Sequence, residues 1–121
     1  MTDTHNYSPG LHKLLTLKVN NTLKLQDLQG FKNHTANTLL TYNLEQVGFS
    51  SHIFDNESFT AAVCLKESHI CIHTWPEFNQ LTIDIYLCNY LRDNSTLVKQ
   101  VAADYVAYFD ADIIKDFEIN R

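Results

Sequence analysis

The sequence predicts an α+β fold, a two-layer sandwich in which an antiparallel-rich sheet carries two helices on one face. The expected elements run in the order strand, helix, four strands, helix, strand, and the links between the four central strands are too short for parallel crossovers. The 121 residues are the size of one ordinary domain, and 45% of them are hydrophobic, enough for a packed core. We expect a flexible polar leader at residues 1–9 and a single domain over residues 10–121.

The first strand and the first helix follow from the spacing of buried-type side chains. Leu15, Leu17 and Val19 alternate with polar residues, which predicts a strand over residues 11–19. Side chains suited to a buried helix face then recur every three to four residues, at Leu28, Phe31, Thr35, Leu39, Leu40 or Tyr42, Leu44 and Val47. We expect this helix to end at Gly48, because glycine is the usual C-terminal cap.

Four strands, a helix and a last strand fill the remainder of the chain. The strands are expected over residues 49–54, 59–66, 69–74 and 81–87. Pro76 interrupts pairing between the last two of these strands, and Asn79 tolerates a positive φ there. Asp93-Asn94-Ser95 offers N-caps for a helix on which Leu97 or Val98, Val101, Tyr105 and Phe109 share a face, and a strand over residues 113–119 ends the domain.

One face of this sheet is left without a helix. In the strand at residues 81–87 the odd-numbered side chains are apolar and suit the helix-covered face, whereas Thr82, Asp84 and Tyr86, continued by Cys88, point the other way. A second copy of the chain could cover that face, so we expect a sheet-on-sheet homodimer.

Composition excludes several classes of function. The formal net charge is -5 with no basic stripe, so nucleic acid is not an expected partner. No apolar run approaches the roughly 20 residues that cross a bilayer, and the first residues are neither basic nor apolar, so we expect a cytoplasmic protein without membrane contact. Cys64, Cys71 and Cys88 are odd in number and lack paired spacing, which favours reduced thiols.

Reactive side chains gather between residues 66 and 77. His69, Cys71 and His73 would share one strand face and could offer nitrogen and sulfur ligands to zinc or iron, but no fourth ligand is indicated and we expect no metal site. A different chemistry is open to Glu67-Ser68. A serine hydroxyl can attack the preceding carbonyl when the backbone is strained, and elimination from the resulting ester leaves a pyruvoyl group, a built-in ketone suited to amino acid decarboxylation.

The segment resembles the signature of a known family. Glu67-Ser68-His69-Ile70-Cys71-Ile72-His73-Thr74-Trp75-Pro76-Glu77 matches ten of the eleven positions of the E-S-H-[IL]-[ST]-I-H-T-W-P-E signature of the short prokaryotic S-adenosylmethionine decarboxylase proenzymes. Asp84 and Cys88 resemble the D-V-x-x-C of the family's next strand, and Gly10-Leu11-His12 resembles its opening G-x-H.

The resemblance implies pyruvoyl-dependent decarboxylation of S-adenosylmethionine, which supplies the aminopropyl donor for spermidine synthesis. Self-cleavage at Glu67-Ser68 would give a β chain of residues 1–67 and an α chain of residues 68–121, with Ser68 as the pyruvoyl group. By resemblance, His73 would act in processing and catalysis, and Cys88 would protonate the decarboxylated carbon. Thr60 stands where the family's processing serine lies. Family members build their sites between protomers.

Substrate binding is implied for two residues of the signature. Glu77 matches the carboxylate that contacts the nucleoside ribose, and Trp75 lies beside it. Three aromatic side chains are candidates to stack on adenine: Phe49, Phe54 and Tyr86.

The sequence departs from the family at Lys66, Cys71, Leu87, Asn89 and Ala61, as well as at Thr60. Two alternatives therefore stay open. One is the same pyruvoyl chemistry on a basic amino acid such as ornithine or arginine, and the other is an uncleaved, non-enzymatic regulatory relative.

Overall fold

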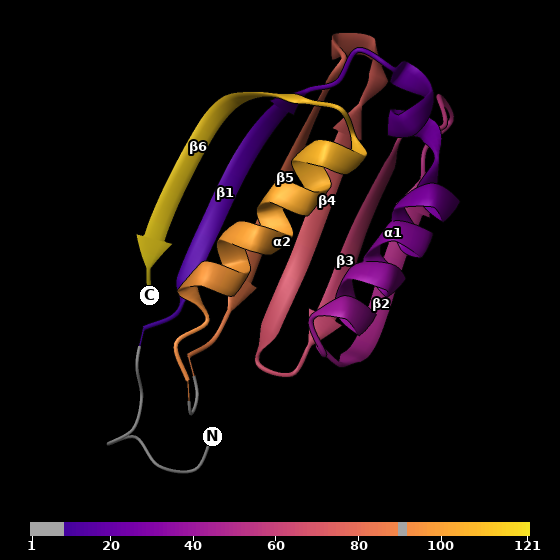
Figure 1. Cartoon of the computed structure of the whole chain (residues 1–121). Helices are drawn as coiled ribbons and strands as arrows, with labels where there is room; N and C mark the ends of the chain where they lie inside the picture. Colours follow the sequence, from indigo (N-terminus) through magenta and orange to yellow (C-terminus); the bar gives the residue numbers. More distant parts are fainter. Residues whose placement is uncertain (1–8, 90–91) are drawn as a thin grey trace.

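The computed structural model describes residues 9–89 and 92–121, in which six antiparallel strands form one sheet with two α-helices (Figure 1). The elements are β1 (Leu11–Lys18), α1 (Leu28–Thr41), β2 (Gln46–Ile53), β3 (Phe59–Leu65), β4 (Ser68–Trp75), β5 (Gln80–Leu87), α2 (Ser95–Tyr108) and β6 (Asp112–Asn120). The strand order is β2-β3-β4-β5-β1-β6, so β1 lies beside β5 at one side and β6 at the other. The predicted α+β fold is confirmed.

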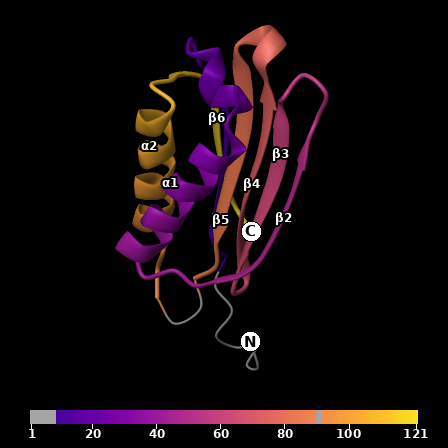
Figure 2. The same ribbon diagram turned by 90° about the vertical axis from the view of Figure 1, so that its right-hand side faces the viewer.

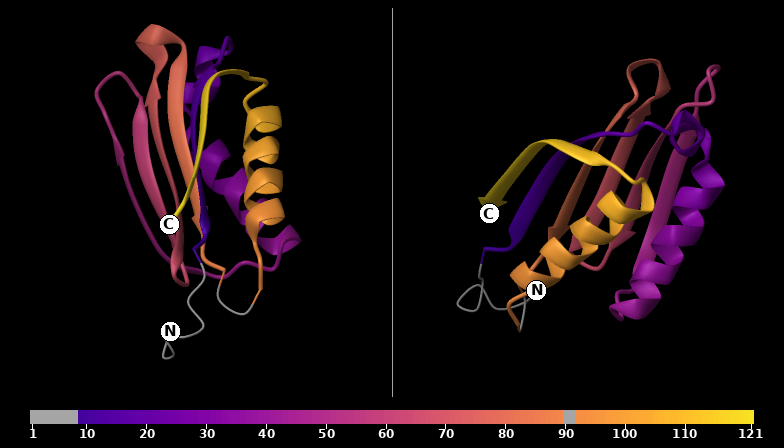
Figure 3. Two further views of the ribbon diagram at one scale, coloured as in Figure 1. Left: turned by 90° about the vertical axis from the view of Figure 1, so that its left-hand side faces the viewer. Right: turned by 45° about the horizontal axis from the view of Figure 1, so that its top comes forward.

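The two helices lie on the same face of the sheet and form the second layer (Figures 2 and 3). Two short 3₁₀ segments, Thr22–Gln26 and Pro76–Phe78, extend the links at one end of the strands. In the part of the chain that the structure describes, no helix is long and apolar enough to span a bilayer. Residues 1–8 of the expected leader lie outside the described residues.

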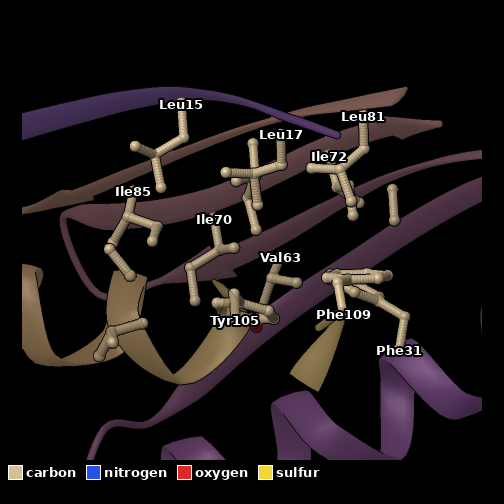
Figure 4. Close-up of a cluster of buried hydrophobic side chains, with 14 of the residues drawn as sticks. Leu15, Leu17, Phe31, Val63, Ile70, Ile72, Leu81, Ile85, Tyr105 and Phe109 are labelled. Atoms are coloured by element: carbon tan, nitrogen blue, oxygen red, sulfur yellow. The ribbon is translucent and has the colours of Figure 1, made fainter. Parts of the chain in front are cut away.

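The core lies between the helices and the sheet. Alternate side chains of the central strands point at the helices, and Ile70, Ile72 and Ile85 are fully buried there (Figure 4). Burial of each such side chain contributes roughly 1.5–3 kcal/mol. Phe31 of α1 stacks on Tyr105 of α2 at 5.7 Å between ring centroids, which joins the two helices above the sheet.

The opposite side of the sheet, which we call the open face, carries the polar rows of the strands. Cross-strand pairing sets these side chains on it: His12, Leu14, Thr16, Thr60, Ala62, His69, Cys71, His73, Thr82, Asp84 and Tyr86. The predicted orientation of the Thr82, Asp84 and Tyr86 row is therefore confirmed. A sheet face rich in histidine and carboxylate side chains is a candidate surface for chemistry.

The predicted end of the first helix is wrong. Helix α1 ends at Thr41, and Gly48 lies within β2, opposite Cys64, where the pairing with β3 shifts register. The C-cap is Tyr42, and the residue after it, Asn43, has a left-handed φ of 56°. Its N–H donates to the carbonyl of Leu40 (3.3 Å), and the next N–H, of Leu44, donates to Leu39 (2.8 Å). Asparagine tolerates this conformation nearly as well as glycine, so the chain turns before the apolar spacing runs out.

Candidate active site

The Glu67-Ser68 bond lies in the tight turn between β3 and β4. Leu65 and Ser68 are the last paired residues of this hairpin, so Lys66 and Glu67 make the turn. Glu67 has a left-handed φ of 56° although it is not glycine. A backbone held in this region stores on the order of 1–3 kcal/mol, so the expected scissile bond follows a strained residue.

Cys88, just beyond β5, contacts both residues of this bond. Its N–H donates to Ser68 Oγ (3.1 Å), and its Sγ lies 3.7 Å from Glu67 Oε2. The pairing of β4 with β5 produces this contact, because His69 lies opposite Tyr86 and the two strand ends therefore meet. The structure thus brings together three of the predicted residues: Glu67, Ser68 and Cys88.

Two asparagines hold the segment that carries Cys88, and the sequence predicted no role at the site for either of them. Asn94 Nδ2 donates to the Cys88 carbonyl oxygen (2.8 Å), and the Asn94 N–H donates to Asn89 Oδ1 (2.8 Å). Asn89 Nδ2 donates in turn to the Pro9 carbonyl oxygen (2.8 Å). Asn89 is one of the departures from the family pattern, and that departure was the one feature of the sequence that could have pointed to this contact.

His73 and Thr60 form a second group on the open face. His73 Nδ1 and Thr60 Oγ1 are 2.5 Å apart, and Thr60 Oγ1 also donates to the Ile72 carbonyl oxygen (3.2 Å). A hydroxyl has a single hydrogen, so while Thr60 donates to the carbonyl, His73 must donate from Nδ1. The Nε2 lone pair of His73 is then the basic atom.

Within one chain, His73 does not meet Ser68. Strand β4 runs unbroken from Ser68 to Trp75, and five residues of strand span about 16 Å. Ser68 pairs with the buried Leu65 on the helix side, whereas His73 is on the open face with Thr60. The predicted processing residues therefore divide into two groups at opposite ends of the strand.

Beside His73 is a hollow of about 290 Å³ that contains the predicted substrate-binding residues. Trp75 and Glu77 line it together with Phe54, and Asn56 Nδ2 donates to Glu77 Oε2 (3.3 Å). Phe54 is half exposed, and Trp75 is also partly open to solvent. Aromatic faces next to a carboxylate suit a nucleoside, whose base stacks and whose hydroxyls donate hydrogen bonds.

The three candidate adenine-stacking residues lie apart. Phe54 belongs to the hollow that holds Glu77. Phe49 instead lines a hollow between α1 and β2, where Lys32 Nζ is 5.1 Å from its ring centroid. Tyr86 lies on the open face, 5.8 Å from the His69 ring. Phe54 is therefore the candidate that shares a hollow with the predicted ribose contact.

A further cluster on the open face joins three strands, and sequence reasoning did not find it. Asp84 Oδ2 lies 2.9 Å from His12 Nε2 and 2.8 Å from His69 Nε2. Arg121 Nη1 lies 3.1 Å from His12 Nδ1. His69, Cys71 and His73 share the open face as expected, but His69 bonds Asp84 and His73 bonds Thr60. Burial, and then the nearby Asp84 and Cys64, raise the pKa of the Cys71 thiol, which keeps it protonated.

The chain is similar to known proteins of one family. The family model of S-adenosylmethionine decarboxylase matches residues 12–121. The S-adenosylmethionine decarboxylase proenzyme of Thermodesulfovibrio yellowstonii is 31% identical over 100 residues, which cover 83% of this chain and 70% of the relative. The proenzyme of Bacillus velezensis is 33% identical over 99 residues, covering 81% of this chain and 74% of the relative.

A solved structure shares the fold. The crystal structure of the adenosylmethionine decarboxylase from Aquifex aeolicus superimposes with a TM-score of 0.76 at 23% sequence identity. The match covers 95% of this chain and 90% of the other. The two-layer arrangement of this chain is therefore also that of a known decarboxylase.

Proposed function

The chain belongs to the S-adenosylmethionine decarboxylase family, and from this premise we propose that it decarboxylates S-adenosylmethionine with a pyruvoyl group made from its own Ser68. The observation that carries the proposal is the contact of Cys88 with both Glu67 and Ser68 at a strained turn. The product would serve as the aminopropyl donor for spermidine synthesis.

Self-cleavage starts from this turn. Ser68 Oγ attacks the Glu67 carbonyl carbon, the Glu67-Ser68 C–N bond breaks, and an ester and a free Ser68 amine result. Loss of the Ser68 α-proton then expels the Glu67 carboxylate and leaves dehydroalanine, which takes up water and releases ammonia. The chain would divide into residues 1–67 and 68–121, and the strain at Glu67 would be released with the bond.

The side chains around Ser68 fit a pyruvoyl group. The Cys88 N–H, which donates to Ser68 Oγ, would orient this hydroxyl for its attack on the Glu67 carbonyl carbon. The same oxygen then leaves with the Glu67 carboxylate, and the β-carbon becomes the pyruvoyl methyl group. The ketone supplies an electrophile that condenses with the substrate amine and accepts the electrons released with carbon dioxide. Cys88 would then give its thiol proton to the substrate α-carbon.

The separation of Ser68 and His73 supports a homodimer in which each site uses both chains. A second copy can pack its open face on that of the first, related to it by a two-fold axis, with its β4 running in the opposite direction. The His73 end of its β4 then lies over the Ser68 end of the first copy's β4. Thr60, Trp75 and Glu77 of that copy would come with it. The site would thereby combine pyruvoyl chemistry from one chain with processing and nucleoside contacts from its partner.

The proposal is tested by release of labelled carbon dioxide from carboxyl-labelled S-adenosylmethionine, ornithine and arginine. We expect release from S-adenosylmethionine alone, and none from the Ser68→Ala variant. Release from ornithine or arginine instead would assign the chain another substrate, and no release from any of the three would contradict the proposed activity.

A further inference from the structure

Four side chains on or beside the open face form a connected array, which we call the Asp84 array. Its members are Arg121, His12, Asp84 and His69, from the end of the chain, β1, β5 and β4. Arg121 contacts His12, and Asp84 Oδ2 lies between the Nε2 atoms of both histidines at 2.9 and 2.8 Å. The His12 side chain is 10% exposed and that of Asp84 29%, so the array is partly shielded from water.

The donor and acceptor capacity of these groups sets the tautomers. Arginine has only donors, so His12 Nδ1 must accept from Arg121. His12 is then neutral, with its hydrogen on Nε2, and it donates to Asp84. The carboxylate, which only accepts, also takes the Nε2 hydrogen of His69. His69 therefore presents Nδ1 as the atom at which it gains or loses a proton.

A metal ion is not the ligand that this array suits. The three ligand atoms of His12, His69 and Asp84 lie within 4.8 Å of one another, a spacing that a divalent cation could use. If a metal bound His12 Nε2, the ring hydrogen would have to be on Nδ1. Nδ1 and Arg121 Nη1 would then both be donors and could not hydrogen-bond to each other. Proton exchange fits the observed contacts and metal binding does not.

The array ends next to the reacting residues. His69 follows Ser68 directly in the chain and lies opposite Tyr86, two residues before Cys88. The Cys88 thiol contacts Glu67 Oε2 in the turn that precedes His69. Cys88 is also the diagonal neighbour of His69 across the β4–β5 pair. Such neighbours lie roughly 7–8 Å apart, a gap that the two side chains and one water between His69 Nδ1 and the Cys88 thiol can span.

We propose that His69, held by Asp84 and His12, is a positioning residue that returns a proton to Cys88 after each decarboxylation. This inference rests on the proposed function and deepens it. Before cleavage the Cys88 thiol contacts Glu67 of the same chain, whereas after cleavage Glu67 is the last residue of the other chain. His69 is the titratable side chain that stays covalently attached to residue 68.

Each proton is accounted for. When carbon dioxide leaves, the electrons of the broken carbon–carbon bond stay on the substrate side. The Cys88 S–H bond then breaks, and its proton bonds to the substrate α-carbon. The His69 Nδ1–H bond then breaks and that proton restores the thiol. His69 regains a proton from water, while its Nε2 hydrogen bond to Asp84 holds the ring in place. The groups that face His69 are Asp84, His12, Tyr86 and Cys64, with Glu67 and Cys88 at the strand ends.

The test compares Asp84→Asn and His69→Ala with a matched control, Asp110→Asn, in an exposed turn far from the open face. Asp110 has a left-handed φ of 47°, which asparagine accepts. We expect both array variants to lose roughly 10- to 100-fold in kcat with little change in KM, and added imidazole to rescue His69→Ala. The acid side of the kcat profile should change in both variants and stay unchanged in Asp110→Asn.

A second readout does not depend on the rate. If the proton reaches the carbon of residue 68 instead of the substrate α-carbon, water then cleaves the bond between the substrate carbon and its nitrogen and releases an aldehyde. The substrate nitrogen stays on the chain, and residue 68 becomes alanine. N-terminal sequencing of the 68–121 chain after turnover should detect more alanine in the array variants than in wild type. Unchanged kcat, pH profile and alanine content in both array variants would overturn the proposal.

The array can also be examined without a pyruvoyl group. In a nitrogen-15 NMR spectrum of Ser68→Ala, His12 and His69 should both carry hydrogen on Nε2 at neutral pH. A His12 hydrogen on Nδ1, or line broadening on zinc addition at the array, would overturn it. Failure of self-cleavage or of S-adenosylmethionine turnover in the wild-type chain would instead reject the proposed function and leave the NMR result standing.

Discussion

Two inactive variants of this chain should restore each other when they are made together. Ser68→Ala removes the pyruvoyl source, and His73→Ala removes the group at the other end of β4. Because roughly 16 Å of strand separates these residues in one chain, a working site needs Ser68 from one copy and His73 from another. Each variant alone is expected to lack activity.

The size of the restored activity follows from two-fold symmetry. If the two variants are expressed equally and pair at random, about half of the dimers are mixed. One site of a mixed dimer joins an intact Ser68 with an intact His73, and its other site has neither. About a quarter of all sites should therefore be complete, and decarboxylation should reach about a quarter of the wild-type rate.

The assay uses two different affinity tags, so that the mixed dimer can be purified and its carbon dioxide release measured per dimer. Light scattering on the same sample gives its mass. A matched mixture of Ser68→Ala with Ser68→Ala,His73→Ala supplies the control and should stay inactive. An inactive mixed dimer of correct mass, or a wild-type chain that is fully active as a strict monomer, would refute the shared site.

Three further predictions concern the groups that support the site. Asn94→Ala removes the hydrogen bond to the Cys88 carbonyl oxygen and should lower kcat about 10-fold with the fold intact. Turnover measures kcat and circular dichroism checks the fold. An unchanged kcat would show that this hydrogen bond has no role in catalysis. Burial lowers the pKa of His34 in the folded chain, despite the nearby Asp104. As the pH falls below the pKa of about 6.5 of the unfolded chain, the unfolded chain therefore binds more protons than the folded one. The stability that is present above pH about 6.5 should be lost as the pH falls below it. Urea unfolding at a series of pH values should show this loss, and it should be smaller in His34→Gln. Tyr105→Phe deletes a buried hydroxyl bonded to Thr35 Oγ1 at 2.6 Å and should cost about 1–3 kcal/mol of unfolding free energy, with Thr35→Val in the same chain recovering part of it.

Local patterns in the sequence were sufficient to predict the sheet and the direction of its side chains. Alternation in β5 separates Leu81 and Ile83 from Thr82 and Asp84, and the short links leave antiparallel pairing as the simple solution. The end of α1 could not be found from apolar spacing, because Leu44 continues the spacing after the backbone has turned at Asn43. A helix end marked by asparagine is a weaker sequence signal than one marked by glycine.

The site was predictable by resemblance more than by pattern. The contact of Cys88 with Ser68 follows from the pairing of adjacent strands, and the resemblance to the family pointed to both residues. The contact of His12 with Asp84 joins residues 72 apart in the sequence. It depends on β1 inserting between β5 and β6, and no local spacing encodes that order. The division of the site into two groups likewise required the unbroken course of β4.

Intact-mass analysis of the purified wild-type chain under denaturing conditions, beside Ser68→Ala, shows whether the chain cleaves itself and converts Ser68 to a pyruvoyl group. The account predicts two wild-type fragments divided at Glu67-Ser68, with the 68–121 fragment lighter than a serine-headed chain by the mass of ammonia. Ser68→Ala should remain whole near 14.0 kDa. A wild-type chain that also stays whole would contradict the pyruvoyl account and favour an uncleaved relative of the family.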